Sequence, residues 1–352
     1  MKKLLALLLV VALVIPMLAA CGAPAPADPS APSASGSAPV AAKKIAIVLD
    51  KVGTQVFLLG MIDGLKEAQA KYGFELIVAE CADGAAYEEN MRSLIAEGVD
   101  LIIGGGWQAG EPISKIATEF PDDADYALID SLVDVENVKC INYNENESAY
   151  LVGMLAAMVT EDADQTFGCV NCNEGAGSWK WRWGYMEGVK AVKPEAKFLF
   201  NYTGSFNDPA KAKEFSLQQY AQGAKFVLGS AAGGDSGVFE AAKEKGFYTA
   251  GQDVDLTSPD SPQIASCQIK DTHKTLTYLM DLYFTEGKWN TDNETWGVKQ
   301  GTIGLVHVTH PGAGKIPAEL SEEELAKLKA VAADIADGKL DLTVPDEANY
   351  GK

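Results

Sequence analysis

The sequence predicts an α/β protein built from two doubly wound lobes, each on a parallel sheet. Short runs rich in β-branched and aromatic residues alternate with amphipathic stretches of helical length, the pattern of βαβ units. This alternation pauses after residue 142 and restarts at residue 167, so there are two series. The chain also has 352 residues, more than the ~250–300 at which a single hydrophobic core stops growing.

The first series begins directly after a low-complexity segment. Its helices are predicted from apolar residues three or four positions apart, as with Leu59, Ile62 and Leu65 in the stretch 58–71. A second helix is expected over 87–97. The expected strands are 45–49, 75–79, 100–103, 126–129 and 138–142.

The second series repeats this rhythm without a fixed-period sequence repeat. The spacing of Ser321 and Glu324 is that of a capping box, so a further helix is expected to start there and to stop near Gly338. The expected strands are 167–170, 198–201, 226–229 and 247–251, and the expected helices are 179–192, 209–222 and 238–245.

The first twenty residues predict a targeting segment. Two lysines precede the apolar run 4–18, which is shorter than the ~20 residues that span a bilayer. The Leu-Ala-Ala-Cys stretch ending at Cys21 resembles the bacterial lipobox, in which the cysteine is lipidated and the chain is cut just before it. An ordinary signal peptide with a chance cysteine is the alternative.

A tether is expected next. Residues 22–42 contain eight Ala, five Pro and four Ser and no aromatic residue, so they cannot bury a core. We therefore expect a signal peptide over 1–20, a lipid-anchored tether over 21–42, and a body held at the extracytoplasmic face of the cell membrane.

Charge and cysteine content narrow the function classes. The formal net charge is −20, which argues against a nucleic-acid partner. Besides Cys21 there are five cysteines, and the pair Cys169 and Cys172 has the CxxC spacing. A redox pair or half of a zinc site is conceivable, but no second CxxC and no nearby His support either. Buried thiols are the favoured interpretation, and a structural disulfide stays open.

Three motifs suggest an enzyme, and each has a plainer interpretation. The stretch 104–109 fits the dinucleotide fingerprint, with Asp130 at a suitable distance, but it follows the third strand of its lobe. A glycine-rich ligand loop at a strand end is favoured. The Gly-Asp-Ser-Gly run at 234–237 has the letters of the nucleophile loop of trypsin-like proteases, but those are β-barrels and this run lies between a predicted strand and a predicted helix. The stretch 311–315 looks like a fragment of a phosphate-binding loop, but it lacks the Ser or Thr that binds Mg²⁺. No metal-ligand spacing is present, so we expect no enzyme, no metal and no cofactor.

Aromatic and acidic residues recur at the carboxyl ends of predicted strands. In parallel sheets those ends meet at one edge, where ligands bind. Aromatic faces can sandwich a planar ring, and carboxylates accept hydrogen bonds from hydroxyl or ring N–H groups. Trp179, Trp181 and Trp183 fit a strand with one aromatic face or a helix start that flanks the cleft, and we favour the helix start. The strand-end residues are Asp50, Trp107, Asp130, Phe206 and Asp253.

Over roughly residues 43–345 the sequence resembles the basic membrane protein family of bacterial lipoproteins, which bind purine nucleosides for ABC transporters. The Gly-Ser-Phe-Asn-Asp-Pro stretch 204–209 and the Gly-Gly-Asp-Ser-Gly-Val stretch 233–238 are the most specific. The other matching stretches are 87–91, 98–104, 126–130, 147–153, 251–253 and 269–270.

The resemblance implies a type I periplasmic-binding fold, two lobes joined by a three-stranded hinge. The expected N-terminal lobe covers 43–146 plus about 252–283, and the C-terminal lobe covers 147–251 plus about 284–352. It also implies an ABC permease as partner and a nucleoside as ligand. The hinge would close around that ligand, and the closed state would be recognised by the permease.

The resemblance further assigns ligand-binding residues. Phe57 and Phe206 match stacking rings, Asp50 and Asp130 match carboxylates of the site, and Gly234 lies in the ligand loop. The pair that holds ribose hydroxyls matches Asp253 and Lys270, and Trp107 and Trp181 stand where the family often has Phe.

One departure concerns the loop after Asp50. It is two residues shorter than the family pattern and carries Thr54 and Gln55 in place of an Asn-Asp step. Another aromatic solute such as riboflavin is therefore an alternative ligand. An exported nucleoside hydrolase or dehydrogenase is a second alternative, and a receptor or adhesin that uses the fold as a scaffold is a third.

Overall fold

A six-stranded parallel sheet forms the centre of the first lobe. The order of its strands across the sheet is β11-β5-β4-β3-β1-β2. The computed structural model describes residues 42–285 and 289–350, so the expected signal peptide, Cys21 and nearly all of the tether lie outside the described residues. The strands are β1 (Lys44–Asp50), β2 (Glu75–Cys81), β3 (Leu101–Gly105), β4 (Asp125–Ile129), β5 (Val138–Tyr143) and β11 (Glu294–Trp296).

The second lobe contains a matching six-stranded sheet with the order β12-β10-β9-β8-β6-β7. Only the β10–β12 pair is antiparallel. The α/β class with two doubly wound lobes is thereby confirmed. The strands are β6 (Thr166–Asn171), β7 (Lys197–Tyr202), β8 (Phe226–Ser230), β9 (Tyr248–Gly251), β10 (Ile264–Lys270) and β12 (Ile303–Leu305).

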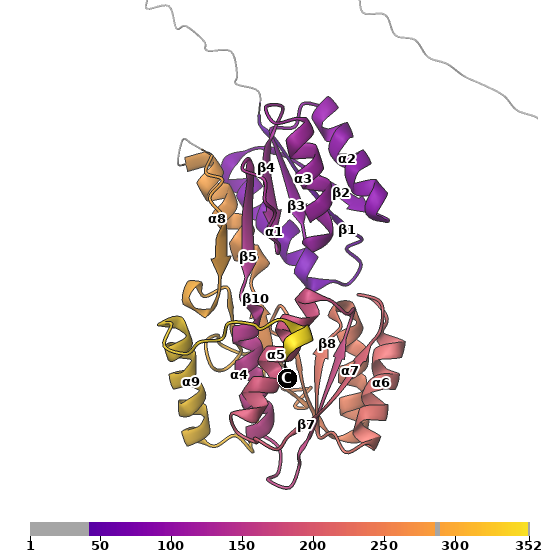
Figure 1. The fold of residues 1–352 in the computed structure, drawn as a ribbon, viewed down its shortest axis with the longest axis vertical. Helices are drawn as coiled ribbons and strands as arrows, with labels where there is room; N and C mark the ends of the chain where they lie inside the picture. Colours follow the sequence, from indigo (N-terminus) through magenta and orange to yellow (C-terminus); the bar gives the residue numbers. More distant parts are fainter. Residues whose placement is uncertain (1–41, 286–288, 351–352) are drawn as a thin grey trace, which may run out of the picture. The chain divides into compact units, whose positions relative to one another are not determined.

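Helices cover both faces of each sheet (Figure 1). On the first sheet, α1 (Val56–Tyr72) and α8 (Thr272–Thr285) pack on one face, and α2 (Gly84–Ala96) and α3 (Gly110–Glu119) pack on the other. On the second sheet, α4 (Glu145–Met158), α5 (Ala176–Lys190) and α9 (Glu322–Ala336) lie opposite α6 (Pro209–Ala221) and α7 (Asp235–Lys245). Short 3₁₀ turns are η1 (Trp107–Ala109), η2 (Ala232–Gly234), η3 (Val298–Gln300) and η4 (Glu347–Asn349).

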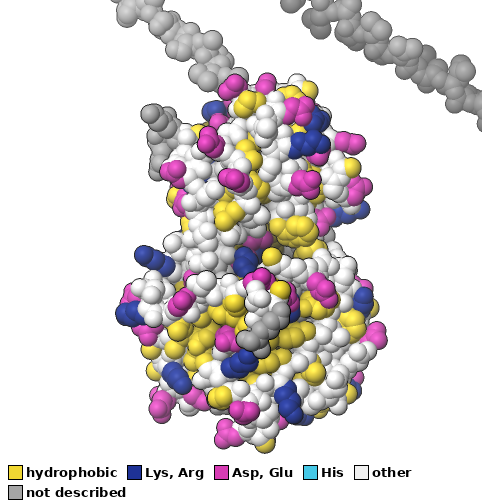
Figure 2. All heavy atoms as spheres, in the orientation of Figure 1, with side chains coloured by type: hydrophobic (Ala, Val, Ile, Leu, Met, Phe, Trp, Pro, Cys, Tyr) yellow, Lys and Arg dark blue, Asp and Glu magenta, His cyan; other side chains and the backbone are white. Residues whose placement is uncertain are grey.

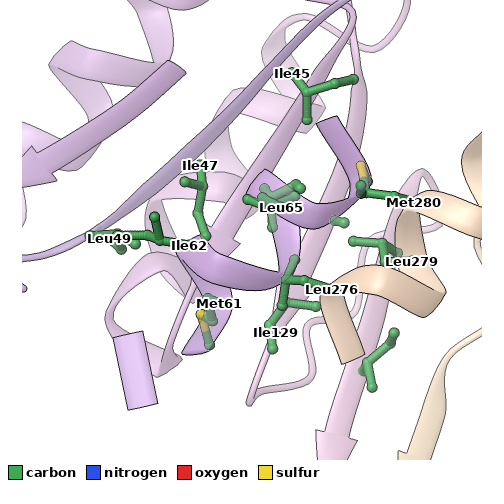
Figure 3. Packing of buried hydrophobic residues seen from close by; sticks show 14 of the residues in the cluster. Ile45, Ile47, Leu49, Met61, Ile62, Leu65, Ile129, Leu276, Leu279 and Met280 are labelled. Carbon is green, nitrogen blue, oxygen red and sulfur yellow. The ribbon is translucent and has the colours of Figure 1, made fainter. Parts of the chain in front are cut away.

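Apolar residues of β1 alternate between the two helix layers. Ile45, Ile47 and Leu49 face α1 and α8, where Leu65 and Leu276 meet them in the core (Figure 3). Ala46 and Val48 face α2 and α3. Because both faces are covered, the strand is a continuous apolar run, which is typical of parallel sheets.

Local signals fix several helix ends. The side chain of Asp83 accepts hydrogen bonds from the N–H groups of Ala85 and Ala86 at the start of α2. The predicted capping box is confirmed: Ser321 accepts from the N–H of Glu324, and the Glu324 carboxylate accepts from Ser321. Such caps satisfy N–H groups that the helix itself leaves free.

The chain passes between the lobes three times. The crossings lie between β5 and α4, between β10 and α8, and between β11 and η3. The strands differ here from the expected lobe bounds. We expected about 252–283 in the N-terminal lobe, but β10 pairs with β9 and β12 of the second sheet. We expected 284 onward in the C-terminal lobe, but β11 pairs with β5 of the first sheet.

Within the described residues, no helix combines the length and the apolar character that a membrane crossing requires.

Candidate functional site

A cleft of about 940 Å³ lies between the lobes, at the carboxyl ends of both sets of parallel strands. This volume is at the upper end of the range for small-molecule sites. On the face shown in Figure 2, hydrophobic atoms and charged atoms of both signs are visible where the two lobes meet. Eight of the nine expected ligand-binding residues line the cleft: Asp50, Phe57, Trp107, Asp130, Trp181, Phe206, Asp253 and Lys270.

Gly234 is the ninth, and it does not line the cleft. It is buried at the end of η2, where an added Cβ would lie 3.2 Å from the Cβ of Ala231. The residue of this turn that lines the cleft is Ala232. Gly234 therefore packs against Ala231 inside the loop and does not face the cavity.

Lys270 occupies the floor of the cleft and joins the lobes. Its Nζ lies 3.0 Å from Oδ1 of Asp130 in the first lobe and 3.4 Å from Oε1 of Glu145 in the second. Glu145 in turn pairs through Oε2 with Lys180, at 2.6 Å. The floor is thus a chain of alternating charges, and the side chains of Lys270 and Glu145 are only 7% and 4% exposed.

Burial and these neighbours shift the proton affinities in opposite directions. Burial raises the pKa of Asp130 to about 6, although Lys270 opposes the shift. Burial would also raise the pKa of Glu145, but Lys180 and Lys270 together hold it below its usual value. Burial alone would lower the pKa of Lys270, yet the surrounding carboxylates of Asp130, Glu145 and Asp253 raise it. Lys270 is therefore a permanent cation.

Asp253 is a buried carboxylate in the wall of the cleft. The residue is 7% exposed, and burial raises its pKa against the opposing field of Lys270. Asp130 and Asp253 both adopt a left-handed backbone, with φ of 70° and 71°, directly after β4 and shortly after β9. Non-glycine residues rarely adopt this conformation, and they concentrate at functional sites. The two lobes therefore present their carboxylates in the same way.

Aromatic rings surround the Lys270 ammonium. Its Nζ lies 4.5 Å from the ring centre of Phe57, 5.6 Å from that of Tyr143 and 5.7 Å from that of Trp181. The backbone carbonyl of Phe57 accepts a hydrogen bond from Thr272 at 2.9 Å, which fixes the start of α1 against α8. The inner part of the cleft therefore combines aromatic rings with a charged group, the Lys270 ammonium.

The short loop after Asp50 makes direct contact with the second lobe. Thr54 donates a hydrogen bond from Oγ1 to Oδ1 of Asn207, at 2.9 Å. Gly233 lies so close that an added Cβ would be 2.4 Å from Asn207 Oδ1 and 2.8 Å from Thr54 Oγ1. Thr54, in the shortened loop, therefore connects the two lobes through this hydrogen bond. Gln55, its neighbour, lines the cleft.

Sequence reasoning missed several parts of the cleft, among them two charged residues and a segment near the C-terminus. Glu145 and Lys180 contribute the inner charges, and the segment 344–347 near the C-terminus forms part of the wall. Glu145 follows β5 at a strand end, so strand-end position could have identified it. Lys180 stands between Trp179 and Trp181, and the predicted helix start there is confirmed by α5. No local signal marks 344–347, because it reaches the cleft only through tertiary packing.

The described cysteines form no disulfide, and one of them reaches the cleft. Cys81, Cys140, Cys169, Cys172 and Cys267 are all free, and only Cys172 lines the cleft. Burial raises the pKa of the Cys172 thiol to about 11, so it is a weak nucleophile at neutral pH. Across 42–285 and 289–350 there is no group of three or more side chains arranged to hold a metal ion.

A family model described as "ABC transporter substrate-binding protein PnrA-like" matches residues 43–335. The CD4+ T-cell-stimulating antigen of Listeria innocua is 26% identical over 287 residues, covering 76% of each chain. The nucleoside-binding protein BmpA of Lactococcus lactis is 31% identical and covers 57% of this chain and 58% of its own. A purine-binding protein of Brucella abortus is 23% identical, with 71% and 69% covered.

The fold is also similar to that of solved solute-binding proteins. The crystal structure of an ABC transporter solute-binding protein from Aeropyrum pernix superposes with a TM-score of 0.76 at 22% identity. It covers 87% of this chain and 95% of that one. The type I periplasmic-binding fold is thereby confirmed.

Proposed function

Because this chain belongs to the PnrA-like family of ABC transporter substrate-binding proteins, we propose that it captures a nucleoside, with a purine base expected. The nucleoside is delivered to the permease of an ABC importer. The observation that carries the proposal is the presence of the Phe57 and Phe206 rings, the Lys270 ammonium and the carboxylates of Asp130 and Asp253 in one cleft between two lobes.

The base is held by stacking and by carboxylates. Phe57 comes from the first lobe and Phe206 from the second, so a planar ring between them contacts both lobes at once. Asp130 accepts hydrogen bonds from ring N–H groups in its ionised form. A ligand with such contacts stabilises the closed arrangement, because it binds that arrangement better than the open one.

The sugar is held by Asp253 and Lys270. Two neighbouring hydroxyl groups of ribose can donate to the Asp253 carboxylate, which has few other partners at this depth. The Lys270 ammonium can donate to a hydroxyl oxygen while it keeps its ion pairs. Free bases and 2′-deoxynucleosides would therefore bind more weakly than ribonucleosides.

Anchoring is part of the same proposal. Lipidation of Cys21 would hold the body at the extracytoplasmic face of the membrane, and 22–42 would span the distance to the permease. Metabolic labelling with a palmitate analogue tests this step, because a Cys21→Ser variant would lose the label while the wild type keeps it.

A thermal-shift panel tests the ligand. Residues 43–352 would be titrated with adenosine, guanosine, inosine, uridine, ribose, riboflavin and NAD. At about 100 times its dissociation constant a ligand stabilises the folded state by about 2.7 kcal/mol. Shifts with purine nucleosides but not with ribose support the proposal. A shift with riboflavin alone would replace the nucleoside by a flavin, and turnover of inosine or NAD would make the protein an enzyme.

A further inference from the structure

The segment from Leu342 to Tyr350, called the strap here, crosses α5 and reaches the cleft (Figure 1). The carbonyl of Leu342 accepts a hydrogen bond from Asn146 at 2.8 Å, and that of Pro345 accepts one from the indole N–H of Trp179 at 2.7 Å. The ring of Tyr350 packs edge-on against Trp179, with 5.2 Å between ring centres. The strap is therefore a fixed part of the cleft wall.

The strap also supplies the ion-pair partner of Arg182. The Arg182 guanidinium lies 5.1 Å from the ring centre of Trp179 and 5.5 Å from those of Phe200 and Tyr202. Its Nη2 is 2.5 Å from Oε1 of Glu347. The Arg182 side chain is 9% exposed, whereas that of Glu347 is 48% exposed. Glu347 lines the cleft and Arg182 does not, so the wall of the cleft presents the carboxylate of this ion pair and not the guanidinium.

The rest of the described cleft wall offers a negative ligand no unpaired cation. Its positive residues are Lys180 and Lys270, and both are ion-paired with carboxylates. Its negative residues are Asp50, Asp130, Glu145, Glu174, Asp253, Asp346 and Glu347. Phosphate groups are held by Arg and Lys side chains or by backbone N–H groups, and a carboxylate wall opposes them.

We propose that Glu347 determines specificity: by neutralising the charge of Arg182 at the cleft wall it excludes phosphorylated forms of the ligand, so that nucleosides enter and nucleoside phosphates do not. The inference rests on the proposed function for the ligand. The neutralisation of Arg182 by Glu347 is a property of the chain and can be tested with inorganic phosphate alone.

The first experiment uses Glu347→Gln in the mature chain. Glutamine can still accept the Arg182 hydrogen bond, so the strap keeps its place while the negative charge is lost. The melting temperature is measured in phosphate and in chloride at equal ionic strength. Phosphate-specific stabilisation is expected for Glu347→Gln and not for the wild type. Glu347→Asp, which keeps the charge, should behave as the wild type does.

Two control variants identify the cause. Glu240→Gln makes the same charge change on exposed α7, where Glu240 pairs with Lys213 at 3.4 Å, and it should gain no phosphate response. The double variant Arg182→Met with Glu347→Gln should lose the response, because the cation that phosphate would use is gone. A response in Glu240→Gln equal to that in Glu347→Gln would overturn the inference, and so would no response in Glu347→Gln.

The second experiment compares adenosine with adenosine 5′-monophosphate by calorimetry. Glu347→Gln should narrow the ratio of the affinities for adenosine and its monophosphate about tenfold, mainly by tightening binding of the monophosphate, since the positive charge of Arg182 is no longer neutralised. A wild type that binds the monophosphate as tightly as adenosine would overturn the inference. If neither compound binds but the phosphate response appears, the nucleoside proposal fails and the role of Glu347 stands.

Discussion

Lys270 of β10 and Asp130 after β4 form an ion pair across the boundary between the lobes, with 3.0 Å between Nζ and Oδ1. Both side chains also face the cleft. A solute that donates to Asp130 or accepts from Lys270 would therefore act on a contact that joins the two lobes, and under the proposed function its recognition would be coupled to closure of the cleft.

Replacement of Lys270 tests this connection. Lys270→Met leaves three carboxylates near one another without their cation, and breaking a buried ion pair by removing one partner destabilises the folded state by about 3–5 kcal/mol. We expect the melting temperature to drop, and we expect nucleoside binding to weaken by about 1.5–3 kcal/mol because the ligand loses a hydrogen bond to a charged group. Lys66→Met, on the exposed side of α1, where Lys66 pairs with Asp63 at 3.3 Å, is the control and should change neither. Unchanged affinity in Lys270→Met would remove Lys270 from the site.

Removal of either stacking ring tests the position of the base. Phe57→Ala and Phe206→Ala should each weaken nucleoside binding by about 1–3 kcal/mol, by analogy with base stacking on aromatic side chains. Leu59→Ala lies on the same helix as Phe57 but outside the cleft, and it should bind as the wild type does. Titration calorimetry measures all three. If both ring variants bind normally, the base lies elsewhere.

Acidification should weaken binding. Burial raises the pKa of Asp130 to about 6, so its carboxylate becomes protonated between pH 7 and pH 5 and can no longer accept two donors. Below its pKa, affinity should fall by up to about tenfold per pH unit. Asp130→Asn should bind more weakly at pH 7.5 and show a flat profile across this range. A wild-type profile as flat as that of Asp130→Asn would contradict the role.

Ionisation of Asp235 should reduce the stability of the folded state as the pH rises. The residue is 3% exposed, and burial raises its pKa well above the usual value although the N–H of Ala231 opposes the shift. The folded state therefore binds this proton more tightly than the unfolded chain does, and stability is lost as the pH rises through the folded-state pKa.

Asp235→Asn removes that loss while an amide oxygen can still accept from Ala231. The free energy of unfolding should rise on the order of 1 kcal/mol at pH 7.5, and the gain should shrink at low pH where the wild-type carboxyl is protonated. Thermal unfolding across pH measures it, with exposed Asp334→Asn as the control. A gain independent of pH would indicate a packing effect instead.

The bridge between Thr54 and Asn207 predicts a smaller change. Thr54→Val keeps the shape of the side chain and loses the hydrogen bond, for which a net contribution of about 0.5–1.5 kcal/mol is typical. Ligand dissociation should become faster by a corresponding factor, because the closed arrangement loses a contact. Stopped-flow fluorescence with Thr54→Ser as the control measures it. Equal dissociation rates would exclude a role in closure.

The sequence predicted the strands well because each is a nearly continuous apolar run. All nine expected strands overlap observed ones, and the expected helices coincide with α1, α2, α5, α6, α7 and α9. Helix α4 escaped the analysis because it is buried on almost all sides and so has no apolar stripe. Close approach to α5 requires small residues there: a Cβ on Gly188 would lie 2.0 Å from the carbonyl of Tyr150.

The sequence predicted which side chains reach the cleft where these residues follow strand ends. Asp130 and Asp253 follow buried strands, so their place at the cleft could be inferred from topology alone. Glu347 could not be inferred in that way. It lies 165 residues after Arg182, and nothing in the local pattern connects two positions so far apart in sequence.

The three crossings between the lobes also determine when each lobe can be completed. Leu276 and Leu279 of α8 cover the apolar face of α1, and β11 closes the edge of the first sheet beside β5. A chain that is synthesised from its N-terminus has already presented the whole of β1–β5 before these partners appear. The first lobe therefore stays incomplete until most of the second lobe has been made, and during that interval the face of α1 that α8 covers has no partner from α8.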